Sequence, residues 1–582
     1  MLLFAVLLGV VAAPDPLPNR TFTVDYDAGQ FLLDGRPFSD RSGEIHYFRM
    51  HENTWESRLR QLRNMGLDTI QTYVAWNFHE IFPGQYSFTG NRDLAKFVAT
   101  AAKHDLKTIL RIGPYICAEW ENGGFPPYVT DSNLTLRSMD ERYLAHVKRW
   151  FDVLLPRIKP LMYTNGGSVL MIQIENEYGL WGKCDKNYMG WLRDIVWHHL
   201  GSETVLFTTD PPDAVECGSV EGVLPTTDFG PRTNRSDIEK IMEGLRKYIP
   251  KGKGPLVNFE YYPGWITKWN ETAEQIDKEM PRDQDIVNGA KWMRELNISY
   301  SFYMAYGGTN PGYWNGAHDD YPVLQSYDYG APIREDGTLR PLWYALRSAI
   351  DRAAGGLDRP RTRAPWALTV PVVQAITIQQ VIDQLAVLVP TKCGTFADCG
   401  LPFGTLCYHS RSGHTCEMLA AQSYGQTYCY GDDYWCVENT GRINYPSKNS
   451  KWGTAVDDKE LVTAVFTEAN IRLLGGMGPR LGNYGAGLYR GYLNLPSLSS
   501  ETPVHISFEN WGRGVLFVNG NNIGRYWSIG PQLSIYVDPN YLKSGSNEII
   551  FLEMLDVNRG CIGGACHLSV SGKATWTHEL RP

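Results

Sequence analysis

The sequence predicts an α/β protein in which a (β/α)8 barrel is followed by a cysteine-rich segment and then a C-terminal β-sandwich of jelly-roll type. Three observations support this prediction. Strand-like apolar runs alternate with amphipathic stretches over residues 43–307. Six cysteines lie between Cys393 and Cys436. Beyond them, short runs of alternating apolar residues are separated by Gly and Asn turns.

Residues 1–13 are interpreted as a signal peptide. The run MLLFAVLLGVVAA ends in small residues and is too short to span a membrane. Eleven cysteines fit an oxidising compartment, and the Asn-x-Ser/Thr triplets fit a secretory route, at Asn19, Asn133, Asn234, Asn270 and Asn297. We therefore expect a lysosomal or extracellular protein without a membrane span. The net charge of -8 argues against a nucleic-acid partner.

Residues 25–355 are predicted to form the barrel, entered through a hairpin whose turn is Asp27-Ala28-Gly29-Gln30. The stretches between the strands, such as TWESRLRQLRNMG, have apolar residues three and four positions apart, which is typical of amphipathic helices. A doubly wound sheet alternates in the same way, but eight units favour closure into a barrel. The expected strands are 43–48, 67–76, 107–116, 168–175, 204–209, 222–229, 255–262 and 298–307.

The remainder of the chain is predicted as two pieces. Residues 356–436 form a linker and the cysteine-rich segment. Because no C-x-x-C pair occurs there, three disulfides are favoured over a zinc site despite His409 and His414, and fifteen pairings are open. Residues 437–582 form the β-sandwich, with strands such as PVHISFE and GVLFVNG.

Polar and aromatic clusters follow several expected barrel strands, as in NFHE, CAEWENGG, NEYG and EYYPGW. Catalytic residues of this fold lie at these C-terminal strand ends. The carboxylates there are Glu119, Glu121, Glu175, Glu177 and Glu260. Carboxylates beside many aromatic residues, with no sign of a metal or cofactor, indicate cleavage of a glycoside.

Glycoside cleavage needs an acid and a second carboxylate on different sides of the sugar. Glu177 and Glu260 follow the fourth and seventh strands and can flank a sugar in this way. Glu175 and Glu177 are expected on one face of one strand, since side chains alternate with a period of two. They are therefore a poor pair, and Glu175 is left without an assigned role.

Eight motifs in order resemble the beta-galactosidases of glycoside hydrolase family 35, of the animal lysosomal type. They cover nearly all of residues 25–350 and are GEIHYFR, IQTYVAWNFHE, RIGPYICAEWENGGFP, QIENEYG, LFTTD, VNFEYYPGW, YGGTNPGYWNGA and SYDYGAPIREDG. The later stretch GVLFVNGNNIGRYWSIGPQ resembles the last β-domain of that family. In such relatives the stretch before VENTGRINY belongs to a first β-domain, part of which the cysteine-rich segment replaces here.

The resemblance implies a retaining exo-beta-galactosidase that removes terminal β-D-galactose from glycans, with no cofactor and no metal. By the same resemblance, Glu177 is the acid/base, Glu260 is the nucleophile, and Asn176 binds the sugar 2-hydroxyl. Tyr262 would orient Glu260, and Trp265 would offer its ring face to the sugar. The remaining implied galactose contacts are Tyr73, Cys117, Ala118, Glu119, Tyr303 and Tyr329.

The resemblance also implies disulfides between Cys184 and Cys217 and between Cys561 and Cys566, with Cys117 as a buried free thiol. Two alternatives stay open at this point. The same mechanism could act on glucosamine or galactan, or the chain could be an inactive sugar-binding protein. The intact pair Glu177 and Glu260 argues against the second alternative.

Overall fold

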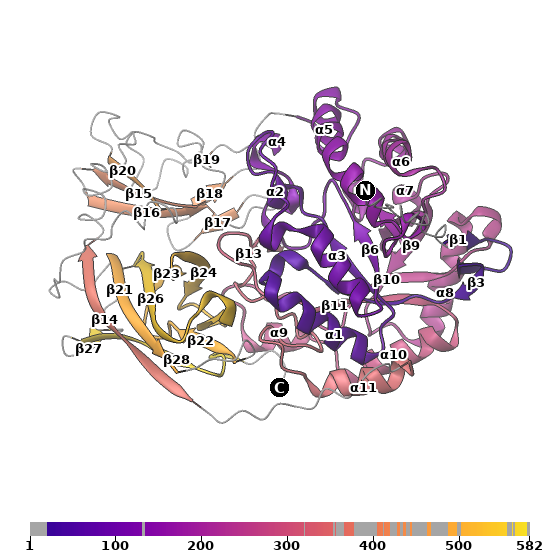
Figure 1. Cartoon of the computed structure of the whole chain (residues 1–582). Coiled ribbons are helices and arrows are strands. Elements are labelled where there is room, and N and C mark those ends of the chain that lie inside the picture. The colour runs from indigo at the N-terminus through magenta and orange to yellow at the C-terminus, as the bar shows by residue number, and fades with distance from the viewer. Residues whose placement is uncertain are drawn as a thin grey trace, which may run out of the picture.

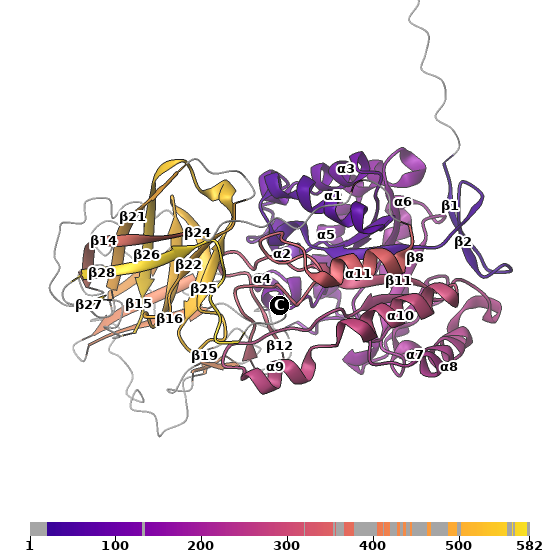
Figure 2. The same cartoon turned by 90° about the horizontal axis from the view of Figure 1, so that it is seen from below.

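The computed structural model shows a barrel and a β-domain side by side (Figures 1 and 2). It describes residues 20–377 and 487–578, with gaps at 131–133, 319–320, 353–355, 357–365, 497–501, 556–560 and 563–564. Between 378 and 486 it describes only the strands β15 Gly404–Ser410, β16 Gly413–Leu419, β17 Tyr428–Tyr430, β18 Trp435–Val437, β19 Ile443–Asn444 and β20 Val462–Phe466. The signal peptide expected at 1–13 lies outside the described residues.

The predicted barrel is confirmed. Eight parallel strands close in the order β10-β11-β4-β5-β6-β7-β8-β9, so each expected strand takes its place in sequence order. Every residue of seven of these strands is buried, as parallel strands covered by helices require. The strands are β4 Arg41–Ile45, β5 Thr69–Tyr73, β6 Lys107–Arg111, β7 Val169–Gln173, β8 Leu206–Asp210, β9 Leu224–Asp228, β10 Val257–Tyr261 and β11 Ser299–Tyr306.

The helices surround the barrel because their apolar faces need cover. Several begin at an Asp, Asn or Thr whose side chain accepts a backbone N–H, for example Asp140 before α5 and Asp185 before α6. The connection from β8 to β9 contains only the one-turn helix α7 Val215–Gly218. The other helices are α1 Trp55–Met65, α2 Trp76–His79, α3 Leu94–Lys103, α4 Pro127–Thr130, α5 Glu141–Ile158, α6 Lys186–Leu200, α8 Arg235–Leu245, α9 Ala273–Glu279, α10 Asp283–Glu295 and α11 Pro341–Ile350.

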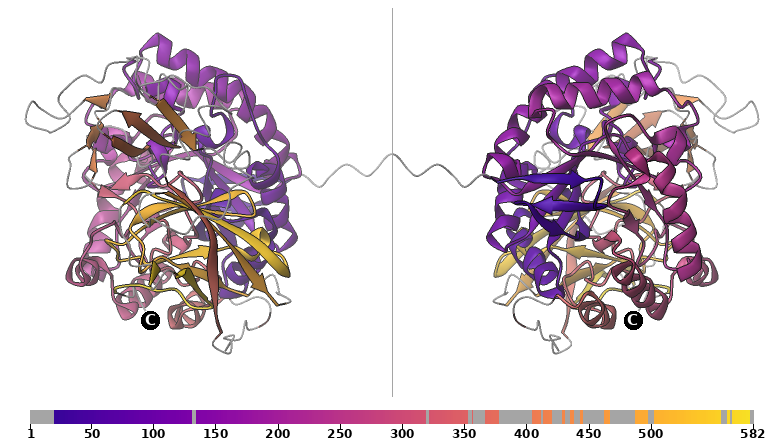
Figure 3. Two further views of the ribbon diagram at one scale, coloured as in Figure 1. Left: turned by 90° about the vertical axis from the view of Figure 1, so that its left-hand side faces the viewer. Right: turned by 90° about the vertical axis from the view of Figure 1, so that its right-hand side faces the viewer.

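The expected N-terminal hairpin is present as β1 Phe22–Asp25 and β2 Gln30–Leu33, extended by β3 Arg36–Phe38. Asp25 faces Gln30 across the turn, and the Asp25 carboxylate accepts the N–H groups of Asp27 and Ala28. The hairpin buries Phe22 and Phe31 against apolar residues of the barrel strands. It lies on the side of the barrel away from the β-domain (Figure 3).

The C-terminal β-domain is antiparallel, as predicted. Its sheet runs β24-β23-β26-β21-β14-β28-β22-β25, and both halves contribute to one apolar core. Strand β14 Ala367–Thr377 joins the two halves, although the sequence assigned it to a linker. The remaining strands are β21 Gly487–Leu495, β22 Val504–Ser507, β23 Arg513–Val518, β24 Asn521–Trp527, β25 Ser534–Val537, β26 Gly545–Glu553, β27 Cys561–Ile562 and β28 Ala565–Ser571.

The β-domain is attached to the barrel by polar contacts. The Thr54 hydroxyl donates to Asp538 at 2.8 Å, and the Ser326 N–H donates to the Gln532 side chain at 2.9 Å. Gln325 reaches from the barrel to accept the Arg525 N–H at 2.9 Å. These contacts anchor the loop after β11 Ser299–Tyr306, which carries part of the site described below.

Cys184 and Cys217 form the expected disulfide, and Cys117 is free. Cys566 is disulfide-bonded and faces Cys561 across strands β27 and β28. In the cysteine-rich segment, Cys393 and Cys399 lie outside the described residues and the side chains of the other four are not described, so its disulfides stay a prediction. Within the described part of the chain, no helix is long and apolar enough to cross a membrane.

Candidate active site

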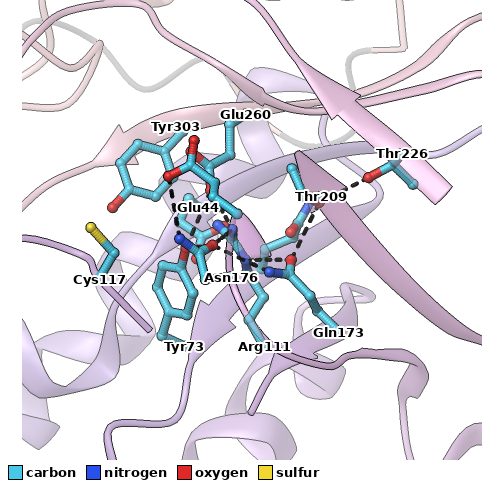
Figure 4. A network of polar contacts seen from close by, with 12 residues as sticks. Glu44, Tyr73, Arg111, Cys117, Gln173, Asn176, Thr209, Thr226, Glu260 and Tyr303 are labelled. Atoms are coloured by element: carbon cyan, nitrogen blue, oxygen red, sulfur yellow. Dashed lines mark hydrogen bonds and ion pairs between the residues drawn. The ribbon is translucent and has the colours of Figure 1, made fainter. Parts of the chain in front are cut away.

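The candidate site lies at the C-terminal ends of the barrel strands, where the sequence predicted it. Arg111 ends β6, Gln173 ends β7, and Glu260 lies one residue before the end of β10. Figure 4 shows Arg111 at the centre of a polar network that includes Glu260, Asn176 and Glu44. All of these groups are at least nine-tenths buried. The network therefore operates away from bulk water, where charges interact strongly.

Glu260 receives three donors. The Arg111 guanidinium bonds one carboxylate oxygen, and the Tyr73 hydroxyl shares its one proton between this oxygen at 3.2 Å and Asn176 at 2.7 Å. The Tyr262 hydroxyl donates to the other oxygen at 3.1 Å. The backbone N–H of Glu260 donates to the Asn258 side-chain oxygen. Donors and a cation on both sides stabilise the ionised carboxylate and fix its direction.

Asn176 is oriented by the same groups. Its side-chain oxygen accepts from Tyr73 at 2.7 Å, from Arg111 at 2.8 Å and from Gln173 at 3.3 Å. The oxygen is thereby saturated, which leaves the amide N–H₂ as the group free to donate into the site. The Asn176 Nδ2 atom donates a long hydrogen bond of 3.5 Å to a carboxyl oxygen of Glu177.

Arg111 and Glu44 are functional residues that the sequence analysis did not single out. Arg111 bonds Asn176 and Glu260 and lies 3.4 Å from Glu44. Burial raises the pKa of Glu44 to about 7, while the charge of Arg111 opposes this rise. Arg111 could have been found from the sequence, because it is a charged residue in the apolar strand KTILR. A buried charge is costly unless it is paired.

Glu177 has the opposite environment to Glu260. Burial, together with the negative charges of Glu260 and Asp210, raises the pKa of Glu177 to about 8. The only hydrogen bond to its carboxyl among the described residues is the long one from Asn176. Its backbone is in the left-handed region, with φ of 42°. Burial and the negative neighbours therefore favour the protonated form of Glu177.

The predicted common face for Glu175 and Glu177 is wrong. Strand β7 ends at Gln173, and Glu175 follows with φ of 59°. Arg137 bonds both oxygens of Glu175, and the Tyr188 hydroxyl donates to it at 2.7 Å. Alternation holds only within an extended strand, so the turn sends the two glutamates into different surroundings. Glu175 holds the turn, because it also accepts the Asn176 N–H.

Glu119 lies on the loop after β6. Its carboxylate accepts from the Tyr327 hydroxyl and lies 3.9 Å from the thiol of Cys117 and from His318. Cys117, Ala118 and Glu119 all have positive φ, between 44° and 58°. Such a run is strained for residues with a side chain, and strain of this kind collects at functional sites. The Ala118 carbonyl is held by Arg49.

Aromatic rings form the rest of the wall. Tyr303 and Tyr329 lie 5.8 Å apart between ring centres, and Trp265 lies 5.3 Å from Tyr262. Tyr73 also contacts Tyr303. The aromatic side chains expected to contact the substrate therefore lie close together, and their role in binding stays a prediction. Glu121 differs, since it lies in the buried turn η4 Glu121–Gly124 with its backbone bonded to other loops.

Two further acids lie beside the pair and were not singled out from the sequence. Asp210 ends β8 and Asp228 ends β9. Burial raises the pKa of Asp210 to about 8, and burial with the charges of Glu177 and Glu260 raises that of Asp228 well above its usual range. The signal was present in LFTTD and TTDF, since each Asp directly follows an apolar strand. In the described residues no cluster of His, Cys, Asp and Glu has the arrangement of a metal site.

Comparisons with known proteins point to one family. Residues 30–353 match Glycosyl hydrolases family 35, and residues 486–547 match "Beta-galactosidase, galactose-binding domain". Beta-galactosidase of Bos taurus is 34% identical over 622 residues, covering 95% of this chain and 94% of that protein. The Homo sapiens enzyme is 34% identical, with 95% and 90% covered, and the Mus musculus Beta-galactosidase-1-like protein is 35% identical, with 92% and 90% covered.

Proposed function

The chain belongs to glycosyl hydrolase family 35, and on that premise we propose that it is a retaining exo-beta-galactosidase acting on terminal β-D-galactose of glycans. The names of its relatives support galactose as the sugar. One observation carries the mechanism, the unequal environment of two glutamates. Three donors hold Glu260, whereas burial and negative charge keep the proton on Glu177.

In the first step, a carboxylate oxygen of Glu260 attacks the anomeric carbon of galactose. The bond to the leaving oxygen breaks as Glu177 transfers its proton to that oxygen. The pKa of about 8 favours this role, because the acid stays protonated until a substrate takes the proton. The product is a galactosyl ester of Glu260 and a free alcohol.

In the second step, Glu177 acts as the base. It is now ionised and takes a proton from a water molecule, whose oxygen attacks the anomeric carbon and displaces Glu260. The esterified Glu260 no longer carries the charge that raised the pKa of Glu177, so the pKa of Glu177 falls when a base is needed. The carbon is inverted twice, and the released sugar keeps the β configuration.

Asn176 supports the transition state of both steps. Three donors fix its oxygen, so its N–H₂ group is presented to the sugar 2-hydroxyl. That hydrogen bond strengthens as the ring becomes an oxocarbenium ion.

The far end of the pocket selects the sugar and its terminal position. Glu119 is suited to accept two hydroxyl groups, since a carboxylate has several acceptor sites. Cys117 and Ala118 lie on the same loop as Glu119, whereas Tyr73 lies beside Glu260 and Asn176. Trp265, Tyr303 and Tyr329 offer ring faces to the apolar face of the sugar. Exo action is part of the proposal, with the Tyr327 hydroxyl holding Glu119 in place to accept the hydroxyl groups of a terminal galactose.

We also propose that the chain enters the secretory pathway and acts in the lysosome or outside the cell. The leader at 1–13, the exposed sequons at Asn234, Asn270 and Asn297, and the Cys184–Cys217 disulfide support this. The barrel at 25–355, the linker and cysteine-rich segment at 356–436 and the β-domain at 437–582 stay a proposal, and β14 Ala367–Thr377 moves from the linker to the β-domain because it pairs with β21 and β28.

The mechanism is tested with two substrates, one whose leaving group needs a proton and one whose leaving group does not. They distinguish the role of Glu177 from that of Glu260. Glu177→Ala should lose about 10²- to 10⁴-fold in kcat/KM on methyl β-galactoside, whose leaving group needs a proton. It should lose far less on 2,4-dinitrophenyl β-galactoside, whose leaving group does not. Added azide should restore turnover and give β-galactosyl azide, because a small anion fits the vacated space and needs no base.

Proton NMR of the first-formed sugar tests retention. We expect β-galactose before mutarotation, and α-galactose would overturn the double displacement. Equal losses on the two substrates would overturn Glu177 as the acid. Absence of wild-type hydrolysis on every β-galactoside, with glucosamine or galactan substrates cleaved instead, would overturn the choice of sugar.

A further inference from the structure

Arg49 is a buried cation that the mechanism above does not use. It ends the turn η1 Tyr47–Arg49, which follows β4, and it is 1% exposed. Its guanidinium donates to three acceptors, which are the Ala118 carbonyl at 2.5 Å, the Asn310 side-chain oxygen at 2.8 Å and the His46 Nδ1 atom. All three acceptors are uncharged, because a histidine nitrogen that accepts a hydrogen bond belongs to a neutral ring. A buried charge that bonds neutral acceptors is costly to place, which points to a role other than filling the core.

The face of the Arg49 guanidinium lies over the ring of Tyr327, with 3.7 Å between Cζ and the ring centre. Such a cation–π contact attracts the cation to the ring and keeps the two together. The Tyr327 hydroxyl donates to the Glu119 carboxylate. Another partner of Arg49, Ala118, directly precedes Glu119 in the chain. Arg49 therefore supports Glu119 in two ways, through the backbone that carries it and through the donor that holds its carboxylate.

Arg49 also joins the two loops that carry these partners. The loop after β11 comes close to the Arg49 backbone, since the Thr309 N–H donates to the Arg49 carbonyl at 2.9 Å. Gly308 has φ of 80°, and a Cβ atom there would lie 2.5 Å from the same carbonyl oxygen, so glycine permits the approach. The same loop provides Asn310, whereas the loop after β6 provides Ala118. One side chain thus fixes the two loops relative to each other.

A second series of contacts leads from Arg49 to the proposed nucleophile. Because His46 Nδ1 accepts from Arg49, the ring proton is on Nε2, which lies 3.1 Å from a carboxyl oxygen of Glu44. Glu44 lies 3.4 Å from Arg111, and Arg111 bonds Glu260. Arg49 therefore contacts the Glu119 end of the pocket through its direct partners, and it reaches Glu260 only through three other side chains.

We propose that Arg49 is a positioning residue that fixes Glu119 for the recognition of galactose, so that loss of Arg49 weakens the discrimination between sugars. This inference rests on the proposed role of Glu119, which is to accept two hydroxyl groups of the sugar. Each nitrogen of the Arg49 guanidinium already donates to the protein. Arg49 therefore acts on the substrate only through Glu119.

The experiment measures kcat/KM on 2,4-dinitrophenyl β-galactoside and on its 3-deoxy, 4-deoxy and 6-deoxy analogues. In wild type, the ratio of parent to analogue reports how much each hydroxyl group contributes to the transition state. Glu119→Ala identifies the two hydroxyl groups that Glu119 accepts, because they lose their acceptor and their ratios should fall about tenfold. Arg49→Met should lower the same two ratios about three- to tenfold and leave the third unchanged.

Arg58→Met is the matched control. Arg58 is also buried, and its guanidinium also lies over a tyrosine ring, with 5.4 Å between Cζ and the ring centre of Tyr306. It also donates to a backbone carbonyl, that of Asp336 at 3.0 Å. Neither partner is among the expected galactose contacts, so Arg58→Met should keep all three wild-type ratios. A purely structural role of Arg49 would lower kcat/KM equally on all four substrates, which would overturn the inference.

A double-mutant cycle tests whether Arg49 acts through Glu119. In the wild-type background, Arg49→Met should lower kcat/KM on the parent substrate about tenfold. In the Glu119→Ala background the same change should cost less than about threefold, because the group that Arg49 positions is absent. Equal losses in the two backgrounds would overturn the inference.

Two milder variants provide the test if Arg49→Met folds poorly. Arg49→Lys keeps the charge but has one nitrogen in place of three, so it should lower the same two ratios to a smaller extent. Tyr327→Phe removes the donor to Glu119, keeps the ring beside Arg49, and should lower the same two ratios. Unchanged ratios in both variants would overturn the inference.

Other outcomes concern the proposed function on which the inference rests. Three unchanged ratios in Glu119→Ala would overturn the proposed role of Glu119, and the inference with it. Absence of wild-type hydrolysis of the parent galactoside would instead overturn the proposed function itself.

Discussion

The turn after β7 carries two glutamates, and their carboxyls have opposite surroundings. On one side, Glu175 is bonded by Arg137 and Tyr188 and accepts the N–H of Asn176. On the other side, Glu177 has one long donor and negative neighbours, and its pKa is raised to about 8. The residues are two positions apart and both lie near the barrel rim.

The difference lies in the charges around each carboxyl. Arg137 bonds both oxygens of Glu175, whereas no cation bonds the Glu177 carboxyl among the described residues. Negative neighbours and burial favour the protonated form of Glu177, which can then give its proton away. Glu260 is also held by donors, and its carboxylate is the proposed nucleophile. The predictions below test this distinction, from the largest expected effect to the smallest.

Glu260→Gln should give the largest effect. The amide is a poor nucleophile, so kcat on 2,4-dinitrophenyl β-galactoside should fall roughly 10⁴-fold or more. The fold should persist, because Arg111 keeps Glu44 as a counter-charge. Stopped assays together with thermal unfolding by circular dichroism measure both quantities. Turnover within tenfold of wild type would contradict the assignment of the nucleophile.

Arg137→Met should instead reduce stability. It leaves Glu175 buried without its cation, which should lower the free energy of unfolding by about 3–5 kcal/mol. Arg142→Met is the matched control, because Arg142 pairs with Asp140 at the surface, where solvent screens the pair, and its loss should change stability far less. Denaturant titration measures both. Equal losses for the two variants would remove the contrast between Glu175 and an ordinary surface pair.

Asp40→Asn tests the same rule at the other end of the barrel. Burial raises the pKa of Asp40 to about 7, so the folded state binds more protons than the unfolded chain between about pH 4 and 7. Raising the pH through this window therefore costs stability. From pH 5 to 7.5, wild type should lose about 2 kcal/mol more than Asp40→Asn. A larger loss of unfolding free energy with rising pH in Asp40→Asn than in wild type would contradict the prediction.

Tyr262→Phe should give the smallest effect. It removes one of the three donors to Glu260, and kcat should fall about tenfold. Tyr261→Phe is the matched control, because the Tyr261 hydroxyl bonds backbone carbonyls of α10 and not the site. Its kcat should stay within about twofold of wild type. Michaelis–Menten kinetics on the same substrate compare the two, and equal losses would show that Tyr262 does not orient the nucleophile.

Most of the fold could be predicted because its signals are local. Each barrel strand is an apolar run bounded by polar residues, and the run alone sets its burial. The strand ends were less predictable. The strand expected at 168–175 is observed only over Val169–Gln173, because the backbone turns at Glu175. Strand β14 was missed because its partners β21 and β28 lie far along the chain.

The sequence by itself determined the barrel and the family and predicted Glu177 and Glu260 as the catalytic pair, because these depend on motifs that are contiguous in the chain. Only the tertiary structure decided which acids share the site and which proton each one keeps. Arg111, Asp210 and Asp228 come from three different strands. Their effect on a neighbouring carboxyl depends on distance and burial, and both are set when the barrel closes.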